Sequence, residues 1–152
     1  HIDGTIGERH NPETHLIPLI LQTASGRRNN FKIYGDDYKT KDGTCVRDYI
    51  HVMDIAEAHL LSLEKLIQTQ ISDIYNIGNK KGYSVREIID MVEEITQTKI
   101  PYKISEKRKG DPAELIADNS KITEKLNWRA KYSDLNTIIN TAWEWEKTLS
   151  NF

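Results

Sequence analysis

The chain has a single cysteine, no long apolar segment and almost no net charge. Cys45 is the one cysteine among 152 residues, which excludes an internal disulfide and favours a reducing compartment such as the cytoplasm. No apolar run approaches the roughly 20 residues that a membrane-spanning helix needs, so no membrane segment is expected. The formal net charge of −2 argues against non-specific binding to nucleic acid. These absences leave an ordinary globular protein, long enough to bury one core.

Glycine is missing from the positions where a dinucleotide-binding loop would need it. The eight glycines are scattered, and no glycine-rich run joins a strand to a helix in the way that Rossmann domains approach a pyrophosphate. The chain also begins at His1 rather than at a methionine, and Met53 and Met91 are internal. A complete dinucleotide-binding domain is therefore not expected in this sequence.

Apolar periodicity and capping residues predict helices that alternate with short strands. Helices are expected over residues 16–23, 54–67, 85–95, 119–126 and 133–149, and strands over 31–34, 47–52, 74–77 and 102–105. Ser84 and Glu87 have the spacing of a capping box, and residues 107–117 are expected to be mostly loop. No linker divides the chain, so we predict one domain, residues 1–152, of α/β (or α+β) class with a small sheet of short strands.

The most informative segment, residues 42–59, reads DGTCVRDYIHVMDIAEAH. If residues 47–52 form a strand, alternation places Arg47, Tyr49 and His51 on one face. A guanidinium and a phenol presented together are well suited to hold an anion, and phosphate is the favoured one. The segment therefore predicts an anion site.

This segment closely resembles a signature of the UDP-glucose 4-epimerases, which are extended short-chain dehydrogenase/reductases. Further strings agree with the same family in order and spacing: TIGERHNPETHLIP, IYGDDY, DIYNIGN, KRKGDPAELIADNSK and LNW. Their agreement over nearly the whole chain is a more specific signal than any single string.

The resemblance implies a parent enzyme that interconverts UDP-glucose and UDP-galactose through a 4-keto intermediate, with tightly bound NAD carrying the hydride. The family's NAD-binding half holds a glycine-rich loop and a Tyr-x-x-x-Lys pair, and neither occurs here. We therefore interpret the chain as the C-terminal, UDP-anchoring part of such an enzyme, without the Rossmann half. It is expected to contain no catalytic residue and to be inactive alone. The family further implies a homodimeric, cytoplasmic parent enzyme of galactose metabolism.

The resemblance assigns Arg47 and Arg108 to the pyrophosphate. Guanidinium groups from two distant segments can clamp two phosphates through bidentate hydrogen bonds. The alternatives are an ion pair between Arg47 and neighbouring Asp48 and, for Arg108, one more solvated charge in the run at 106–109. If Arg47 and Arg108 point into unrelated regions of the folded chain, with no shared hollow between them, the nucleotide-sugar assignment fails.

Other site residues follow from the same resemblance. Asp111 matches a position whose carboxylate accepts hydrogen bonds from ribose hydroxyls, although an Asp before a proline also suits a loop. Tyr49 is either a ribose or phosphate contact or a buried aromatic residue. Lys32, Ile33 and Tyr34 match the segment that borders the uracil through its backbone and an aromatic ring. An ordinary strand at that segment is compatible with this role.

His15 and Leu16 match family positions that contact the nucleotide from a helix start, where free N–H groups favour phosphate. The family often has Asn at the position of His15, so the role of the imidazole is open. Leu115 stands where some relatives have a Tyr at the edge of the sugar pocket. The choice between hexose and N-acetylhexosamine is therefore open as well.

Several ligand-type side chains lie near the N-terminus; they are His1, Asp3, His10 and His15. Their spacing fits no metal-ligand pattern and their segment is expected to be loop, so we predict no metal site. His10, His51 and His59 are instead expected to be hydrogen-bonded structural groups rather than catalytic bases.

Two rival functions remain open at this stage. One is a related sugar-nucleotide dehydratase or decarboxylase, and the other is a non-catalytic nucleotide-sugar binding module or a half-enzyme that needs a separate NAD-binding chain. Nucleic-acid binding through residues 107–109 is disfavoured because no aromatic residues are interleaved with the charges. A chain lacking half of its parent should expose apolar surface and an unpaired strand edge near residues 74–77. It is then expected to self-associate or to be poorly stable.

Overall fold

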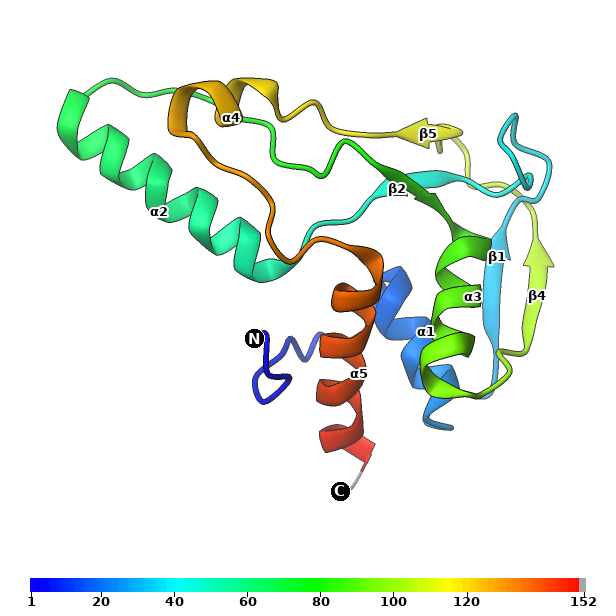
Figure 1. Ribbon diagram of the computed structural model, residues 1–152. Helices are drawn as coiled ribbons and strands as arrows, with labels where there is room; N and C mark the ends of the chain where they lie inside the picture. Colours follow the sequence, from blue (N-terminus) through cyan, green and yellow to red (C-terminus); the bar gives the residue numbers. More distant parts are fainter. Residues whose placement is uncertain (151–152) are drawn as a thin grey trace.

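The computed structural model describes residues 1–150, which form five helices and five strands (Figure 1). The helices are α1 (Leu16–Ala24), α2 (Val52–Thr69), α3 (Val85–Thr96), α4 (Ser120–Leu126) and α5 (Leu135–Ser150). The strands are β1 (Phe31–Tyr34), β2 (Val46–Asp48), β3 (Gly82–Ser84), β4 (Tyr102–Ser105) and β5 (Glu114–Leu115). The predicted class, mixed α/β with short strands, is confirmed.

The strands make two separate small sheets. In one, β1 pairs in parallel with β4, and Ile33 lies opposite Ile104. In the other, β2 is the central strand, antiparallel to β3 and parallel to β5. Neither sheet exceeds three strands, so most of the buried apolar surface must come from helices.

The main core lies where α1, α3 and α5 pack together beside β1 (Figure 1). Ile20, Ile88 and Ile139, one from each helix, are completely buried there. The capping box at the start of α3 forms as predicted. The Ser84 hydroxyl accepts from the Glu87 N–H at 3.1 Å, and the Glu87 carboxylate accepts from the Ser84 N–H at 2.8 Å.

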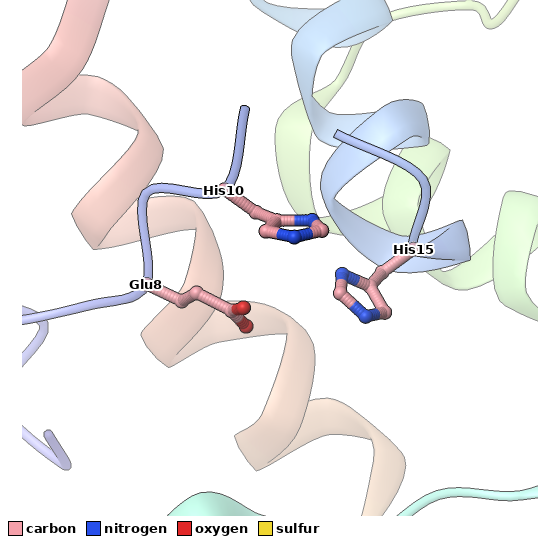
Figure 2. A group of neighbouring side chains, drawn as sticks. All are labelled: Glu8, His10 and His15. Carbon is pink, nitrogen blue, oxygen red and sulfur yellow. The ribbon is translucent and has the colours of Figure 1, made fainter. Parts of the chain in front are cut away.

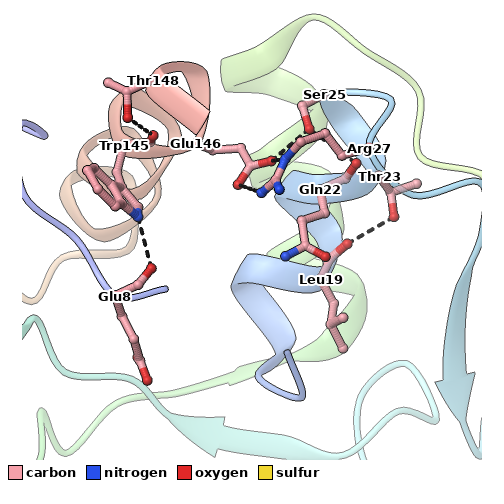
Figure 3. Close-up of polar contacts among 9 residues, drawn as sticks. All are labelled: Glu8, Leu19, Gln22, Thr23, Ser25, Arg27, Trp145, Glu146 and Thr148. Atoms are coloured by element: carbon pink, nitrogen blue, oxygen red, sulfur yellow. Dashed lines mark hydrogen bonds and ion pairs between the residues drawn. The ribbon is translucent and has the colours of Figure 1, made fainter. Parts of the chain in front are cut away.

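A buried carboxylate joins α5 to the end of α1 (Figure 3). Glu146 accepts hydrogen bonds from the Ser25 hydroxyl at 2.7 Å and from two nitrogens of the Arg27 guanidinium at 2.6 Å each. Fork-like pairing of this kind fixes both orientation and distance. The network therefore locks two of the three helices of the main core against one another.

A second, smaller cluster lies between α2 and α4. Ala58, Ile122 and Trp128 are its buried members. The Trp128 indole donates to the Asp54 carbonyl oxygen at 3.0 Å, and the buried Asp54 carboxylate accepts from the Lys131 N–H at 2.9 Å. These bonds attach α2 to the segment that leads into α5. Beyond this contact, α2 projects away from the main core (Figure 1).

The predicted strand over residues 47–52 is wrong in its second half. β2 ends at Asp48, and α2 begins at Val52 rather than at residue 54. His51 is the reason, because its extended backbone precedes the helix and its ring accepts from the Met53 N–H at 3.1 Å. The imidazole thus acts as the N-cap, and strict strand alternation ends before it.

The predicted strand over residues 74–77 does not form. A strand needs a neighbour for its N–H and C=O groups, and no described segment pairs with this one. Ile74 is 83% exposed, and its carbonyl oxygen accepts from the Lys121 ammonium at 2.8 Å instead. Conversely, β3 and β5 were not predicted, because each is too short to show a pattern and depends on pairing with β2.

Apolar side chains of α2 and of the segment after it are exposed. Leu63 and Ile67 of α2 are 53% and 63% exposed, and Leu60 of α2 and Ile71 just after it are exposed as well. Such a contiguous apolar surface is typical of an interaction face. No helix within residues 1–150 combines the length and apolarity needed to cross a bilayer.

Candidate functional site

Tyr34 and Arg108 meet although they lie on different strands and loops. β1 ends at Tyr34 and its partner β4 ends at Ser105, so the loop after β4 starts beside Tyr34. The Arg108 guanidinium carbon lies 4.0 Å from the centre of the Tyr34 ring. This cation–π contact orients the guanidinium, although Arg108 itself is exposed.

Arg47 pairs with Asp111 across a long sequence separation. The guanidinium forms an ion pair with the Asp111 carboxylate and donates to the Pro112 carbonyl oxygen at 2.8 Å. The alternative pairing with Asp48 is wrong. The Asp48 carboxylate instead accepts from the Asn79 backbone N–H at 2.9 Å.

A tight turn brings Arg108 and Asp111 to the same side of this loop. The Asp111 N–H donates to the Arg108 carbonyl oxygen at 3.2 Å. Gly110, inside the turn, has a φ of +81°, a left-handed conformation that a glycine adopts without steric cost. The glycine between Arg108 and Asp111 therefore allows the turn that this hydrogen bond closes.

Asp111 links the two arginines. Its carboxylate pairs with the Arg47 guanidinium, and its N–H donates to the Arg108 carbonyl oxygen at 3.2 Å. Arg47 therefore contacts the turn that carries Arg108. Burial raises the pKa of the nearby Cys45 thiol, whereas the charges of Arg47 and Arg108 lower it and that of Asp111 raises it.

The remaining residues of this region have mixed exposure. Lys32 and Tyr34 point to solvent, whereas Ile33 is buried in the main core. Ile33 can therefore reach a ligand only through its backbone. Leu115 lies in β5 opposite Arg47, with an exposed side chain.

Tyr38 was not selected from the sequence, yet it belongs to this region. Its ring lies 4.5 Å from the Lys107 ammonium, and its buried hydroxyl has no hydrogen-bond partner within residues 1–150. Gly35 allows this approach, since a Cβ there would lie 2.7 Å from the Tyr38 ring. An unsatisfied buried hydroxyl is costly unless a ligand or water completes it. No pattern in the sequence indicates a buried hydroxyl of this kind.

His15, Leu16 and Tyr49 lie elsewhere, around a cavity of about 910 Å³ between the N-terminal loop, α1 and α5. Neither Arg47 nor Arg108 lines this cavity. Tyr49 packs against the main core, and burial raises the pKa of its phenol. The predicted site residues therefore divide into an arginine group and a cavity group.

His15 occupies the position before the first turn of α1. Its backbone is extended, and its side chain does not cap the helix. Instead the ring Nδ1–H donates to the Glu13 carboxylate at 2.8 Å, and that carboxylate also accepts from the Thr14 N–H at 2.8 Å.

The structural roles predicted for two histidines are confirmed. His51 is buried, caps α2 and lies 3.0 Å from the Thr141 hydroxyl through Nε2. Burial lowers the pKa of its imidazole. The His59 Nδ1–H donates to the Ile55 carbonyl oxygen at 2.8 Å, one turn back in α2.

His10 does not share this structural role. Its ring centre lies 5.2 Å from that of His15, and Glu8 completes a group whose ligand-type atoms all lie within 4.8 Å of one another (Figure 2). The N-terminal side chains for which the sequence predicts no metal site include His1 and Asp3. The structure pairs those two with each other at 2.7 Å and groups the two remaining histidines with Glu8.

Comparison with known proteins identifies the family of this chain. Residues 4–141 match the family described as GDP-mannose 4,6 dehydratase. The chain belongs to this family. Curated relatives add detail, since the UDP-glucose 4-epimerase of Halalkalibacterium halodurans is 50% identical over 145 residues, 95% of this chain and 43% of that protein. The resemblance noted from the sequence is confirmed.

Solved structures give the same result. The UDP-glucose 4-epimerase of Brucella ovis, in complex with NAD, superposes with a TM-score of 0.90 at 47% identity, over 94% of this chain and 44% of that one. The UDP-glucose 4-epimerase of Bifidobacterium longum, in complex with NAD⁺ and UDP, superposes with a TM-score of 0.88 at 35% identity. The match covers 100% of this chain and 45% of that one. This family member thus spans less than half the length of its relatives.

Proposed function

We propose that this chain is the nucleotide-sugar-binding part, C-terminal in the parent protein, of a UDP-glucose 4-epimerase. The observation that carries the proposal is the ion pair of Arg47 with Asp111, which joins Arg47 to the distant turn that carries Arg108. UDP brings two phosphates and a ribose, and this group offers two guanidinium cations and a carboxylate acceptor. The similarity to proteins named UDP-glucose 4-epimerase supports the same ligand.

The proposed binding uses each group in a distinct way. Arg108, oriented by Tyr34, and Arg47, held by Asp111, donate to the pyrophosphate in paired hydrogen bonds. Asp111 accepts from the ribose hydroxyls, and the backbone of residues 32–34 borders the uracil, with Tyr34 as the aromatic neighbour. His15, Leu16 and Tyr49 contact the ligand from the cavity. Binding energy from the remote UDP moiety holds the sugar while its C4 carbon reacts.

NAD is proposed to be held mainly by residues outside this chain. Within residues 1–150 no strand runs through a glycine-rich turn into a helix, so the pyrophosphate of a dinucleotide has no loop of the usual kind here. When bound in the parent enzyme, NAD would supply the hydride transfer at C4. This chain would supply anchoring and orientation, with no catalytic residue of its own, and would be inactive alone.

The exposed apolar face of α2 supports a missing partner domain. We propose that this face and residues 71–77, where Ile74 is 83% exposed, are covered in the parent enzyme by its NAD-binding half. Residues 1–152 then form one substrate-binding domain. A homodimeric parent, a role in galactose metabolism and a cytoplasmic location are further parts of the proposal.

UDP binding to the whole chain, measured by calorimetry, tests the proposal. We expect a dissociation constant on the order of micromolar and a loss of about tenfold or more in Arg108→Ala, because a charged hydrogen-bonding partner is removed. Arg129→Ala, at an exposed arginine after α4, is the matched control. Affinity for UDP that is equal in both variants would contradict the arginine clamp.

A related dehydratase is the second candidate, because the matching family is described by a GDP-mannose 4,6 dehydratase. Product analysis of the complete parent protein distinguishes the two. An epimerised sugar supports the first function, and loss of water supports the second. Strong UDP binding by the complete parent protein, without turnover, would instead indicate a binding module.

A further inference from the structure

Glu8, His10 and His15 form a compact group of ligand-type side chains (Figure 2), and all three line the cavity. One nitrogen of each imidazole and one oxygen of the carboxylate lie within 4.8 Å of one another. Ligands of one tetrahedral Zn²⁺ lie about 3.3 Å apart, given bond lengths near 2.0 Å. Small rotations of exposed side chains are enough to close this difference.

The backbone that carries the group is held in place. The Trp145 indole of α5 donates to the Glu8 carbonyl oxygen at 2.9 Å (Figure 3). Gly7 lies flat on the same indole, since a Cβ there would come within 2.4 Å of the Trp145 ring. The N-terminal loop is therefore fixed against α5, and His15 is fixed by the start of α1. Three ligands on two anchored segments are better organised than three on a free loop.

A second layer surrounds His15. Its Nδ1–H donates to Glu13 at 2.8 Å, and the same carboxylate accepts from the Thr14 and His15 backbone N–H groups at 2.8 Å each. The Glu13 side chain is only 10% exposed. Carboxylates that orient a histidine in this way are the usual outer partners of metal-binding imidazoles.

We propose that Glu8, His10 and His15 bind one divalent transition-metal ion of the Zn²⁺ type, with a coordination position left open toward the cavity. Two imidazoles and a carboxylate are a common protein ligand set for Zn²⁺. The site is separate from the arginine group and goes beyond the proposed function. His15 is the residue shared with the proposed nucleotide contacts.

Titration of the metal-free chain with Zn²⁺ against a chromogenic chelator tests the site. We expect one ion per chain, and His10→Ala and His15→Ala should each weaken binding by about tenfold or more. Glu8→Gln should weaken it less, because it keeps an oxygen donor. Co²⁺ in place of Zn²⁺ should give the visible absorption of a four-coordinate site, and His10→Ala should abolish that absorption.

Two histidine variants serve as controls. His59→Ala removes an exposed imidazole on α2, and His1→Ala removes another of the imidazoles that line the cavity. Both should keep the affinity of the unmodified chain. The site is refuted if Zn²⁺ affinity is unchanged in His10→Ala, or if it is lost in His1→Ala alone. UDP affinity in His10→Ala, measured without metal, should stay normal, which separates failure of this site from failure of the proposed function.

Discussion

α3 and α2 both carry apolar side chains, but within residues 1–150 those of α3 are better covered. α3 packs into the main core with α1 and α5, and its Ile88 is completely buried. In the α2 arm, which we define as residues 52–78, Ala58 is buried beside α4, but further apolar side chains are exposed; they are Leu60, Leu63, Ile67, Ile71 and Ile74. Amphipathic spacing therefore indicates that a helix packs against another surface, but not that this surface belongs to the same chain.

The largest expected effect compares one residue from each region. Ile139→Ala empties a fully buried position and should lower the free energy of unfolding by about 2–5 kcal/mol. Leu63→Ala removes the same kind of side chain from the α2 arm, where it is 53% exposed, and should change that free energy by less than about 0.5 kcal/mol. Urea unfolding followed by circular dichroism gives both values. Equal losses would mean that α2 is covered after all.

The next effect concerns association. The exposed face of the α2 arm should make the isolated chain self-associate, and Leu63→Lys with Ile67→Lys should shift it toward monomer, because two charges cannot be buried unpaired. Sedimentation velocity measures the change. Asn136→Lys with Asn140→Lys adds the same charges, four residues apart on α5, as a control. A chain that is monomeric without any substitution would argue against an exposed docking face.

The smallest expected effect is a change in how the stability of the fold depends on pH, through Asp42 beside the main core. Burial raises the pKa of the Asp42 carboxyl, but hydrogen bonds from Ser84 and Thr44 outweigh burial, so the pKa lies below the ordinary 3.8. A lowered carboxyl pKa stabilises the fold above 3.8, and this stability is lost as the pH falls below that value. Asp42→Asn should therefore flatten the acid end of the stability curve.

Thermal unfolding between about pH 2 and pH 6 measures this difference. Asp36→Asn, at an exposed aspartate of the preceding turn, is the matched control and should leave the curve unchanged. Because Asp42 joins the turn before β2 to the cap of α3, the effect belongs to the main core. An identical flattening in the control would assign it to net charge instead.

Local signals were sufficient for much of this molecule. The capping box of Ser84 and Glu87 formed as predicted, as did β1, β4 and the apolar stripes of α3 and α5. Each depends on residues within a few turns of one another, where propensity and periodicity act directly. The motif strings were also sufficient to indicate the family, because spacing in the sequence is enough for that purpose.

Long-range contacts decided what the local signals could not. Residues 74–77 have the composition of a strand but no described neighbour to pair with, whereas β5 has little strand character and pairs with β2. The choice of Asp111 over Asp48 as the partner of Arg47 was likewise made by the turn at Gly110. Backbone pairing and ion pairing depend on which distant segments meet.

By itself, the sequence determined the family resemblance, the helical core and the pair of arginines. Only the tertiary structure decided that Arg47 pairs with Asp111 in the turn of Arg108, that several apolar side chains of the α2 arm are left exposed, and that Glu8 joins His10 and His15. The physical reason is the same in each case. A residue's chemistry is local, but its distance to a second charge, ligand or apolar surface depends on how the whole chain folds.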